Sequence, residues 1–132
     1  MKKLFLLLML VGIAIVSCNE ELLPETFNLG LEEDFKLGGE YESSNQSLIF
    51  SIAEINDSRC PSDVVCVWEG KADVRIDVVS PQSGSILLST YDNLIDTVGG
   101  YSFELIDVSP YPISTKTIKL KDYNVALKIV EL

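Results

Sequence analysis

The chain of 132 residues has no histidine, only three cysteines and a single tryptophan. Without histidine, neither a Ser-His-Asp triad nor a Cys-His pair can form, so the sites of most nucleophilic hydrolases are excluded. The Gly-x-Gly-x-x-Gly and Gly-Lys-Ser/Thr loops that bind phosphates are absent, and so is the EF-hand spacing. A zinc site needs four ligands, and two nearby cysteines supply only half of them. We therefore predict no catalytic residue, no enzymatic activity, no cofactor and no metal site.

Basic residues are also scarce. The chain has 10 lysines and arginines against 20 aspartates and glutamates, and its formal net charge is −10 at pH 7. Nucleic acid carries the same sign of charge, and binding to its phosphates requires a basic surface. We therefore exclude nucleic acid as a partner and interpret the acidic balance mainly as an aid to solubility.

The N-terminus, MKKLFLLLMLVGIAIVSC, has the three parts of a secretory signal. Two lysines form the basic part, residues 4–16 contain no polar side chain, and Ser17 is the small residue that a signal peptidase requires. The apolar run is shorter than the roughly 20 residues that span a bilayer. We predict a signal peptide over residues 1–17, helical from Lys3 to Val16, with few contacts to the rest of the chain.

The apolar run ends at a cysteine. Residues 15–18, Ile-Val-Ser-Cys, resemble a bacterial lipobox, in which the cysteine thiol is acylated before cleavage. Two or three acyl chains make a membrane attachment effectively permanent. The resemblance implies a lipid anchor on Cys18 and a location at the outer membrane or cell surface, and an ordinary secreted protein is the alternative. The residues CNEE are similar to a surface-export signal of some Gram-negative lineages, and a solvated tether would explain them equally well.

The rest of the chain has the pattern of a β protein. Residues 18–31 are polar and interrupted by Pro24, so we predict a flexible tether there. From residue 32 onwards, apolar and polar residues alternate in short runs separated by turn residues. The expected strands are 34–42, 47–55, 65–79, 85–91, 101–108 and 123–131, with a short piece around 118–120. This pattern favours a single antiparallel β-sandwich or small barrel of six to seven strands over residues 32–132.

The expected strand 65–79 separates into two faces. Its even positions are Cys, Trp, Gly, Ala and three aliphatic residues, and its odd positions from 69 to 77 are all charged. Because the side chains of a strand alternate, we predict that Trp68 lies in the core beside Val74 and Ile76. The opposite, exposed face comprises Glu69, Lys71, Asp73 and Arg75. A straight strand of this length would span roughly 50 Å, so a bend is expected near Gly70.

Cys60 and Cys66 lie within the stretch DSRCPSDVVCVWEG, residues 57–70. In an exported protein the oxidised pair is the default state, so we predict a disulfide between them, with Cα atoms about 4.4 to 6.8 Å apart. Closing so short a loop stabilises the fold by only about 2 kcal/mol. A redox dithiol is the alternative, although such dithiols usually occur as Cys-x-x-Cys at the start of a helix.

The same stretch resembles a motif of small Gram-negative bacterial lipoproteins: Asp-Ser-Arg-Cys-Pro, four variable residues, then Cys-x-Trp-x-Gly. A second segment, YSFELIDVSPYP at residues 101–112, is similar to the segment before the last strands of those proteins. The likeness extends from Leu48 to Glu131. It implies the lipoprotein class and supports the disulfide, but it implies no activity, because the function of those relatives is unassigned.

Two functions of different classes are compatible with these features. The first is a binding module, anchored to the membrane through lipid on Cys18, that recognises an envelope or extracellular protein or glycan. Its candidate binding loop contains Asp57, Arg59, Pro61 and Asp63. The second is a peptidase inhibitor in which the loop from Ser58 to Asp63 presents Arg59 to a protease, pre-organised by the disulfide and the proline. In a simpler interpretation, Arg59 only pairs with Asp57 or Asp63.

Two features around residue 95 remain open. The side chains of DNLID, Asp92 to Asp96, include oxygens that suit calcium, but a solvated turn uses the same residues. DTV, Asp96 to Val98, is similar to an O-glycosylation site used in some Gram-negative envelopes. This similarity implies a sugar on Thr97, which a glycopeptide mass spectrum would detect.

Overall fold

The computed structural model describes residues 22–132. The predicted signal helix, the lipidation site Cys18 and the acidic residues that follow it lie outside the described residues. Within residues 22–132, no helix has the length and apolar character needed to span a bilayer.

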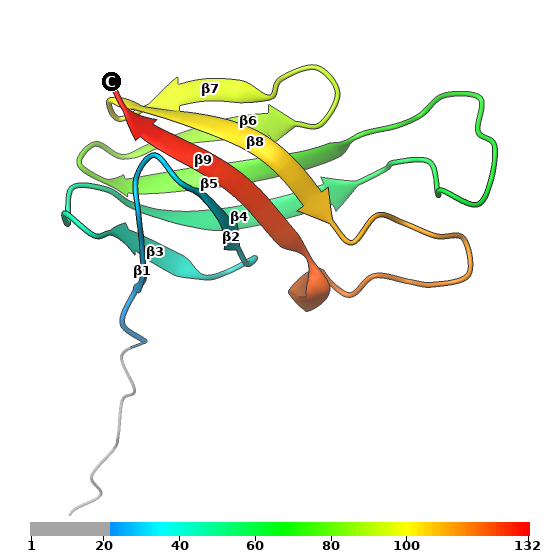
Figure 1. The fold of residues 1–132 in the computed structure, drawn as a ribbon, viewed down its shortest axis with the longest axis horizontal. Coiled ribbons are helices and arrows are strands. Elements are labelled where there is room, and N and C mark those ends of the chain that lie inside the picture. The colour runs from blue at the N-terminus through cyan, green and yellow to red at the C-terminus, as the bar shows by residue number, and fades with distance from the viewer. Residues whose placement is uncertain (1–21) are drawn as a thin grey trace, which may run out of the picture.

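The described chain is nearly all β and forms two sheets that pack face to face, which confirms the predicted sandwich (Figure 1). The five-stranded sheet contains, in spatial order, β1 (Glu25–Phe27), β3 (Glu40–Ser43), β4 (Ile49–Asp57), β5 (Ala72–Ser80) and β6 (Gly84–Ser89). The four-stranded sheet contains β2 (Glu32–Phe35), β9 (Asn124–Glu131), β8 (Tyr101–Ser109) and β7 (Ile95–Val98). Neighbouring strands are antiparallel except for β1 and β3, which run parallel.

The core lies between the two sheets and follows the alternation of the sequence. In β5 the four even positions from Ala72 to Val78 are buried and the odd positions are more exposed, as parity predicted for this part of the strand. Four buried phenylalanines from both sheets pack edge to face at ring-centroid distances of 5.1 to 5.5 Å: Phe27, Phe35, Phe50 and Phe103. Each such side chain stabilises the fold by about 1.5 to 3 kcal/mol through burial, and the edge-to-face geometry adds to this.

The described residues contain nine strands rather than the expected six to seven. The expected strand 34–42 is divided into β2 and β3, because the chain passes between the sheets at Gly38, whose φ is +77°. Strand β7 lies in a segment whose sequence is typical of a turn. Gly99 and Gly100, both at positive φ, connect this strand to β8 in a two-residue hairpin. The piece around 118–120 is irregular and leads into the 3₁₀ helix η1 (Leu120–Asp122).

Ordered structure begins before residue 32, so the tether predicted over residues 18–31 is too long. Strand β1 pairs with β3, and Phe27 is only 2% exposed. The backbone NH of Ser44 donates to the carbonyl of Phe27 at 2.8 Å, and that of Gly30 donates to Ile129 at 2.7 Å. Phe27 is a lone aromatic residue in a polar segment, which gives no periodic signal, yet burying its side chain contributes about 1.5 to 3 kcal/mol to the fold.

Three connections leave the sandwich at one end, which we call the loop end. They are the β4–β5 connection (residues 58–71), the β6–β7 connection (residues 90–94) and the β8–β9 connection (residues 110–123). The first and the third extend furthest beyond the strands, on the right of Figure 1. The loop end is therefore where the stretch DSRCPSDVVCVWEG is presented.

Candidate binding site at the loop end

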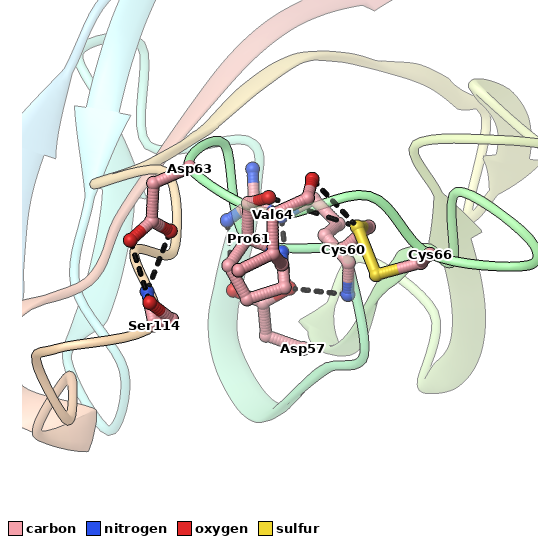
Figure 2. Close-up of a disulfide and its surroundings, with 8 residues drawn as sticks. Asp57, Cys60, Pro61, Asp63, Val64, Cys66 and Ser114 are labelled. Atoms are coloured by element: carbon pink, nitrogen blue, oxygen red, sulfur yellow. Dashed lines mark hydrogen bonds and ion pairs between the residues drawn. A yellow bond between two sulfur atoms is a disulfide. The ribbon is translucent and has the colours of Figure 1, made fainter.

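The predicted disulfide is present between Cys60 and Cys66, whose Cα atoms are 5.9 Å apart (Figure 2). Next to the disulfide, two backbone hydrogen bonds extend the pairing of β4 and β5 beyond the ends of these strands. The NH of Ser58 donates to the carbonyl of Lys71 at 2.8 Å, and the NH of Cys60 donates to that of Glu69 at 2.7 Å. The disulfide and these bonds together fix the base of a short loop that contains Pro61 and Asp63.

The prediction that Trp68 lies in the core is wrong. Strand β5 begins only at Ala72, and Trp68 is 55% exposed, with its ring 5.5 Å from that of Tyr91. The cause is Gly70, which has a φ of +69° and lies so close to Ser58 that a Cβ would stand 1.9 Å from the Ser58 carbonyl oxygen. The backbone turns at this glycine, so the parity that holds from Ala72 onwards does not extend back to Trp68.

The charged side chains of the expected exposed face divide between two places. Arg75 is exposed and pairs with Glu54, while the half-buried Lys71 and Asp73 pair with each other at 3.4 Å. Glu69 lies at the loop end and takes no part in this face. Asp73 and Arg75 also line a groove of about 220 Å³ on the outer surface of β4 and β5. Ion pairs this open to solvent are worth at most about 1 kcal/mol each.

Asp57 and Arg59 form a buried ion pair at the base of the disulfide loop, as the simpler interpretation of Arg59 expected. Nε and Nη2 of Arg59 donate to the two carboxylate oxygens of Asp57, each at 2.8 Å, and the two side chains are only 5 to 6% exposed. The hydroxyl of Tyr123 donates to Asp57 Oδ2 at 2.9 Å. These contacts connect β4 of one sheet to the start of β9 in the other.

The three groups of this cluster have shifted pKa values. Burial acts to raise the pKa of Asp57, but hydrogen bonds from Arg59 and Tyr123 outweigh it and hold the pKa below its ordinary range. Burial acts to lower the pKa of Arg59, and the bond to Asp57 reverses this and raises it. Burial and the Asp57 carboxylate raise the pKa of Tyr123 to about 12. The cluster therefore holds a carboxylate, a guanidinium and a neutral phenol over the whole physiological range.

The remaining contacts of Arg59 keep it inside the protein. Nη1 donates to the carbonyl of Val108 at 2.7 Å, and Nη2 donates to that of Pro110 at 3.2 Å. The guanidinium carbon lies 4.6 Å from the centre of the Tyr111 ring. Arg59 thus connects the β4–β5 connection to the end of β8. A protease could not engage this side chain without breaking these bonds, so the structure does not favour its presentation as an inhibitory residue.

The other residues of the candidate loop tie it to the β8–β9 connection. Asp63 accepts hydrogen bonds from the NH and the hydroxyl of Ser114, at 2.8 and 2.5 Å (Figure 2). The bonds from Ser114 lower the pKa of Asp63. The NH of Ser62 donates to the carbonyl of Pro112 at 3.0 Å, and Pro61 accepts a turn bond from Val64 at 3.3 Å. The two longest connections therefore form one unit.

The two aspartates of the segment DNLID each have another contact in the structure. Asp92 lies 3.5 Å from the amine of Lys71, and Asp96 accepts a hydrogen bond from the NH of Thr97 at 2.7 Å. In the part of the chain that the structure describes, no group of three or more His, Cys, Asp or Glu side chains is placed to hold a metal. Thr97 is exposed in β7, where a modifying enzyme can reach it, and its glycosylation stays a prediction.

A concavity at the loop end, which we call the loop-end groove, has a volume of about 310 Å³. Its lining includes Glu69, Tyr91, Leu94, Ile106, Asp107 and Tyr111, with Arg59 and Gly70 also in its wall. All three connections and the end of β8 contribute to it. Sequence reasoning missed most of these residues. The one local signal is in FELIDV, where Leu105 and Ile106 break the alternation and the structure has a register shift that turns Ile106 outwards.

Comparison of the chain with protein-family models, with curated proteins and with solved structures found no significant match. The resemblance of residues 57–70 to small bacterial lipoproteins therefore stays a prediction from the sequence.

Proposed function

We propose that this protein is a lipid-anchored lipoprotein of the outer membrane or cell surface, without enzymatic activity of its own. Its β-sandwich acts as a binding module, and the loop-end groove and its rim are the binding site. The occupant is a protein or a glycan of the envelope or the extracellular space. The observation that carries the proposal is the concentration of exposed apolar side chains in this groove and on the connections that form it.

Five of these side chains lie on the three connections that form the groove. Val65 and Val67 are fully exposed, and Trp68, Tyr91 and Tyr111 are each 51 to 55% exposed. Single exposed apolar residues are ordinary, but a contiguous group around a concavity marks a binding surface. Tryptophan and tyrosine are also the residues most enriched at the centres of protein interfaces.

The site is held in shape before any partner arrives. The disulfide, the turn at Gly70, the Asp57–Arg59 pair and the Asp63–Ser114 bonds all restrict the connections that carry it. Ordering a flexible loop on binding costs about 0.5 to 1.5 kcal/mol for each immobilised side chain, so a preformed site retains more of its contact energy. A scaffold with rigid loops suits recognition.

Photo-crosslinking in the native envelope tests this proposal. We would replace Val67 by a photoreactive amino acid in the full chain and compare it with the same replacement at Leu31, which is also an exposed aliphatic residue but lies between β1 and β2. We expect a discrete adduct from position 67 that competes with added unlabelled protein. Equal labelling from both positions, or none from position 67, would contradict the proposal.

The anchor is tested separately by metabolic labelling with a fatty acid. The full chain should incorporate the label and fractionate with membranes, and Cys18→Ser should do neither. Labelling of the serine variant would show that the lipid is not on Cys18.

A further inference from the structure

The charges in the wall of the loop-end groove do not balance. The single cation, Arg59, is neutralised by its two bonds to Asp57. The two other charged side chains, Glu69 and Asp107, are exposed and have no ion pair or side-chain hydrogen bond with any other residue between 22 and 132. The groove therefore has two uncompensated carboxylates within a chain that is itself strongly acidic.

Aromatic rings lie beside these carboxylates. Tyr91 and Tyr111 line the groove, and Trp68 contacts Tyr91 from outside it. Cations bind the faces of such rings, most strongly where water is displaced. The protein already uses this interaction, since the guanidinium of Arg59 lies over the Tyr111 ring at 4.6 Å.

The surroundings of the groove fit an anchor residue of a protein partner. Val65 and Val67 are fully exposed on the same connection as the lining residue Glu69 and offer apolar contact area there. The groove volume of about 310 Å³ is at the lower limit of clefts that hold small ligands, roughly 300 to 1,000 Å³. In protein interfaces, one long side chain typically enters a central pocket and the surrounding apolar contacts exclude water. Arginine is one of the three residues most often found in that role.

We propose that the loop-end groove receives an arginine side chain from an extended segment of a partner protein. The guanidinium lies between the rings of Tyr91 and Tyr111 and pairs with Glu69 and Asp107, while apolar residues on either side of the arginine contact Val65 and Val67. Arginine suits the site better than lysine because its flat guanidinium stacks on rings and forms paired bonds with a carboxylate. This inference rests on the proposed function and specifies the chemistry of the partner.

Trp68 provides a direct measurement, because it is the only tryptophan of the chain and contacts a groove residue. The full chain in detergent would be titrated with a capped pentapeptide that has one arginine between two leucines. The matched peptide has citrulline, which has nearly the same shape and no charge. We expect a saturable change in Trp68 fluorescence with the arginine peptide, at a dissociation constant below about 1 mM. The citrulline peptide should bind at least tenfold more weakly, and added salt should reduce the difference.

Variants of the two carboxylates locate the interaction. Glu69→Gln with Asp107→Asn should weaken binding of the arginine peptide at least tenfold. The control pair, Glu40→Gln with Glu131→Gln, removes the same charge from exposed positions outside the groove and should change binding less than twofold. Equal effects of the two pairs would mean that only net charge matters and would overturn the inference.

The outcomes separate the inference from the proposed function. Equal binding of both peptides would overturn the arginine pocket and leave a binding site that recognises apolar groups. Failure of both peptides, with an intact crosslinked adduct from position 67, would also overturn it and favour a glycan or another type of protein surface. If neither peptide binds and no adduct forms at position 67, both the arginine pocket and the proposed binding site are contradicted.

Discussion

The side chain of Arg59 connects the two sheets at the loop end. It donates to the Asp57 carboxylate in the five-stranded sheet and to two carbonyls at the end of β8 in the other sheet. A carboxylate or a carbonyl that is left without a hydrogen bond inside a protein costs more free energy than one that is exposed to water. Asp57 and Arg59, which the sequence suggested as binding residues, therefore have a structural role, and the proposed binding surface is formed by their neighbours.

The first prediction is that Arg59→Met destabilises the protein strongly. The variant keeps a long side chain but leaves the buried Asp57 carboxylate without its cation, and breaking a buried pair in this way costs about 3 to 5 kcal/mol. The free energy of unfolding would be measured by urea denaturation. Arg75→Met is the matched control, because Arg75 is exposed and its pairs contribute at most about 1 kcal/mol. Similar losses in the two variants would contradict the role given to Arg59.

At the scale of the element, the turn at Gly70 decides what the β4–β5 connection presents. The second prediction is that Gly70→Ala lowers the free energy of unfolding by more than the positive φ alone explains. A left-handed conformation costs a non-glycine residue about 1 to 2 kcal/mol. At Gly70 a methyl group would also collide with the Ser58 carbonyl, so the total should exceed that range.

Gly30→Ala is the control for this prediction, since Gly30 has a φ of +82° and no atom within 4 Å of a built Cβ. Urea denaturation gives the two losses, and Trp68 fluorescence reports whether the connection moves. If the two alanine variants lose the same stability, the close approach of Ser58 has no energetic importance.

The elements also show which structural features a sequence reveals. The buried face of β5 and the sandwich class were predictable, because their alternation is long and regular. The Cys60–Cys66 bridge and the Asp57–Arg59 pair were predictable because their partners are close in sequence. The exposure of Trp68 was not, because the alternation continues through Gly70 while the backbone turns there. The groove was not either, because it joins residues from β8 and three connections, and only Ile106 leaves a local signal.

At the scale of the whole molecule, the third prediction concerns stability at the two extremes of pH. The pKa of Asp57 is lowered in the folded state, so its contribution is present above about pH 4 and is lost as the pH falls through the folded value. The pKa of Tyr123 is raised to about 12, so stability is retained below about pH 10 and is lost as the pH rises towards 12. The protein should therefore be most stable between these limits.

Tyr123→Phe tests the alkaline side. The wild-type free energy of unfolding should fall by about 2 kcal/mol between pH 10 and 12 through this one group. Tyr41, whose pKa is also raised by burial, adds to the loss in both proteins. Urea denaturation at several alkaline pH values should give a shallower decline for the variant. Identical slopes would show that the Tyr123 hydroxyl does not hold its proton more tightly after folding.

The entry of the chain through β1 also has a consequence for the proposed lipid anchor on Cys18, because it sets the length of the tether. Strand β1 begins at Glu25, only seven residues after Cys18, and seven residues reach at most about 25 Å. With the proposed lipid on Cys18, β1 would stay within that distance of the bilayer surface. The loop end lies away from β1 along the long axis of the sandwich (Figure 1), so its distance from the bilayer would be limited by the tether and the length of the domain together. If the proposed anchor is present, a partner in the same membrane would meet the groove at a high effective concentration, and even a weak pairwise affinity would give a large bound fraction.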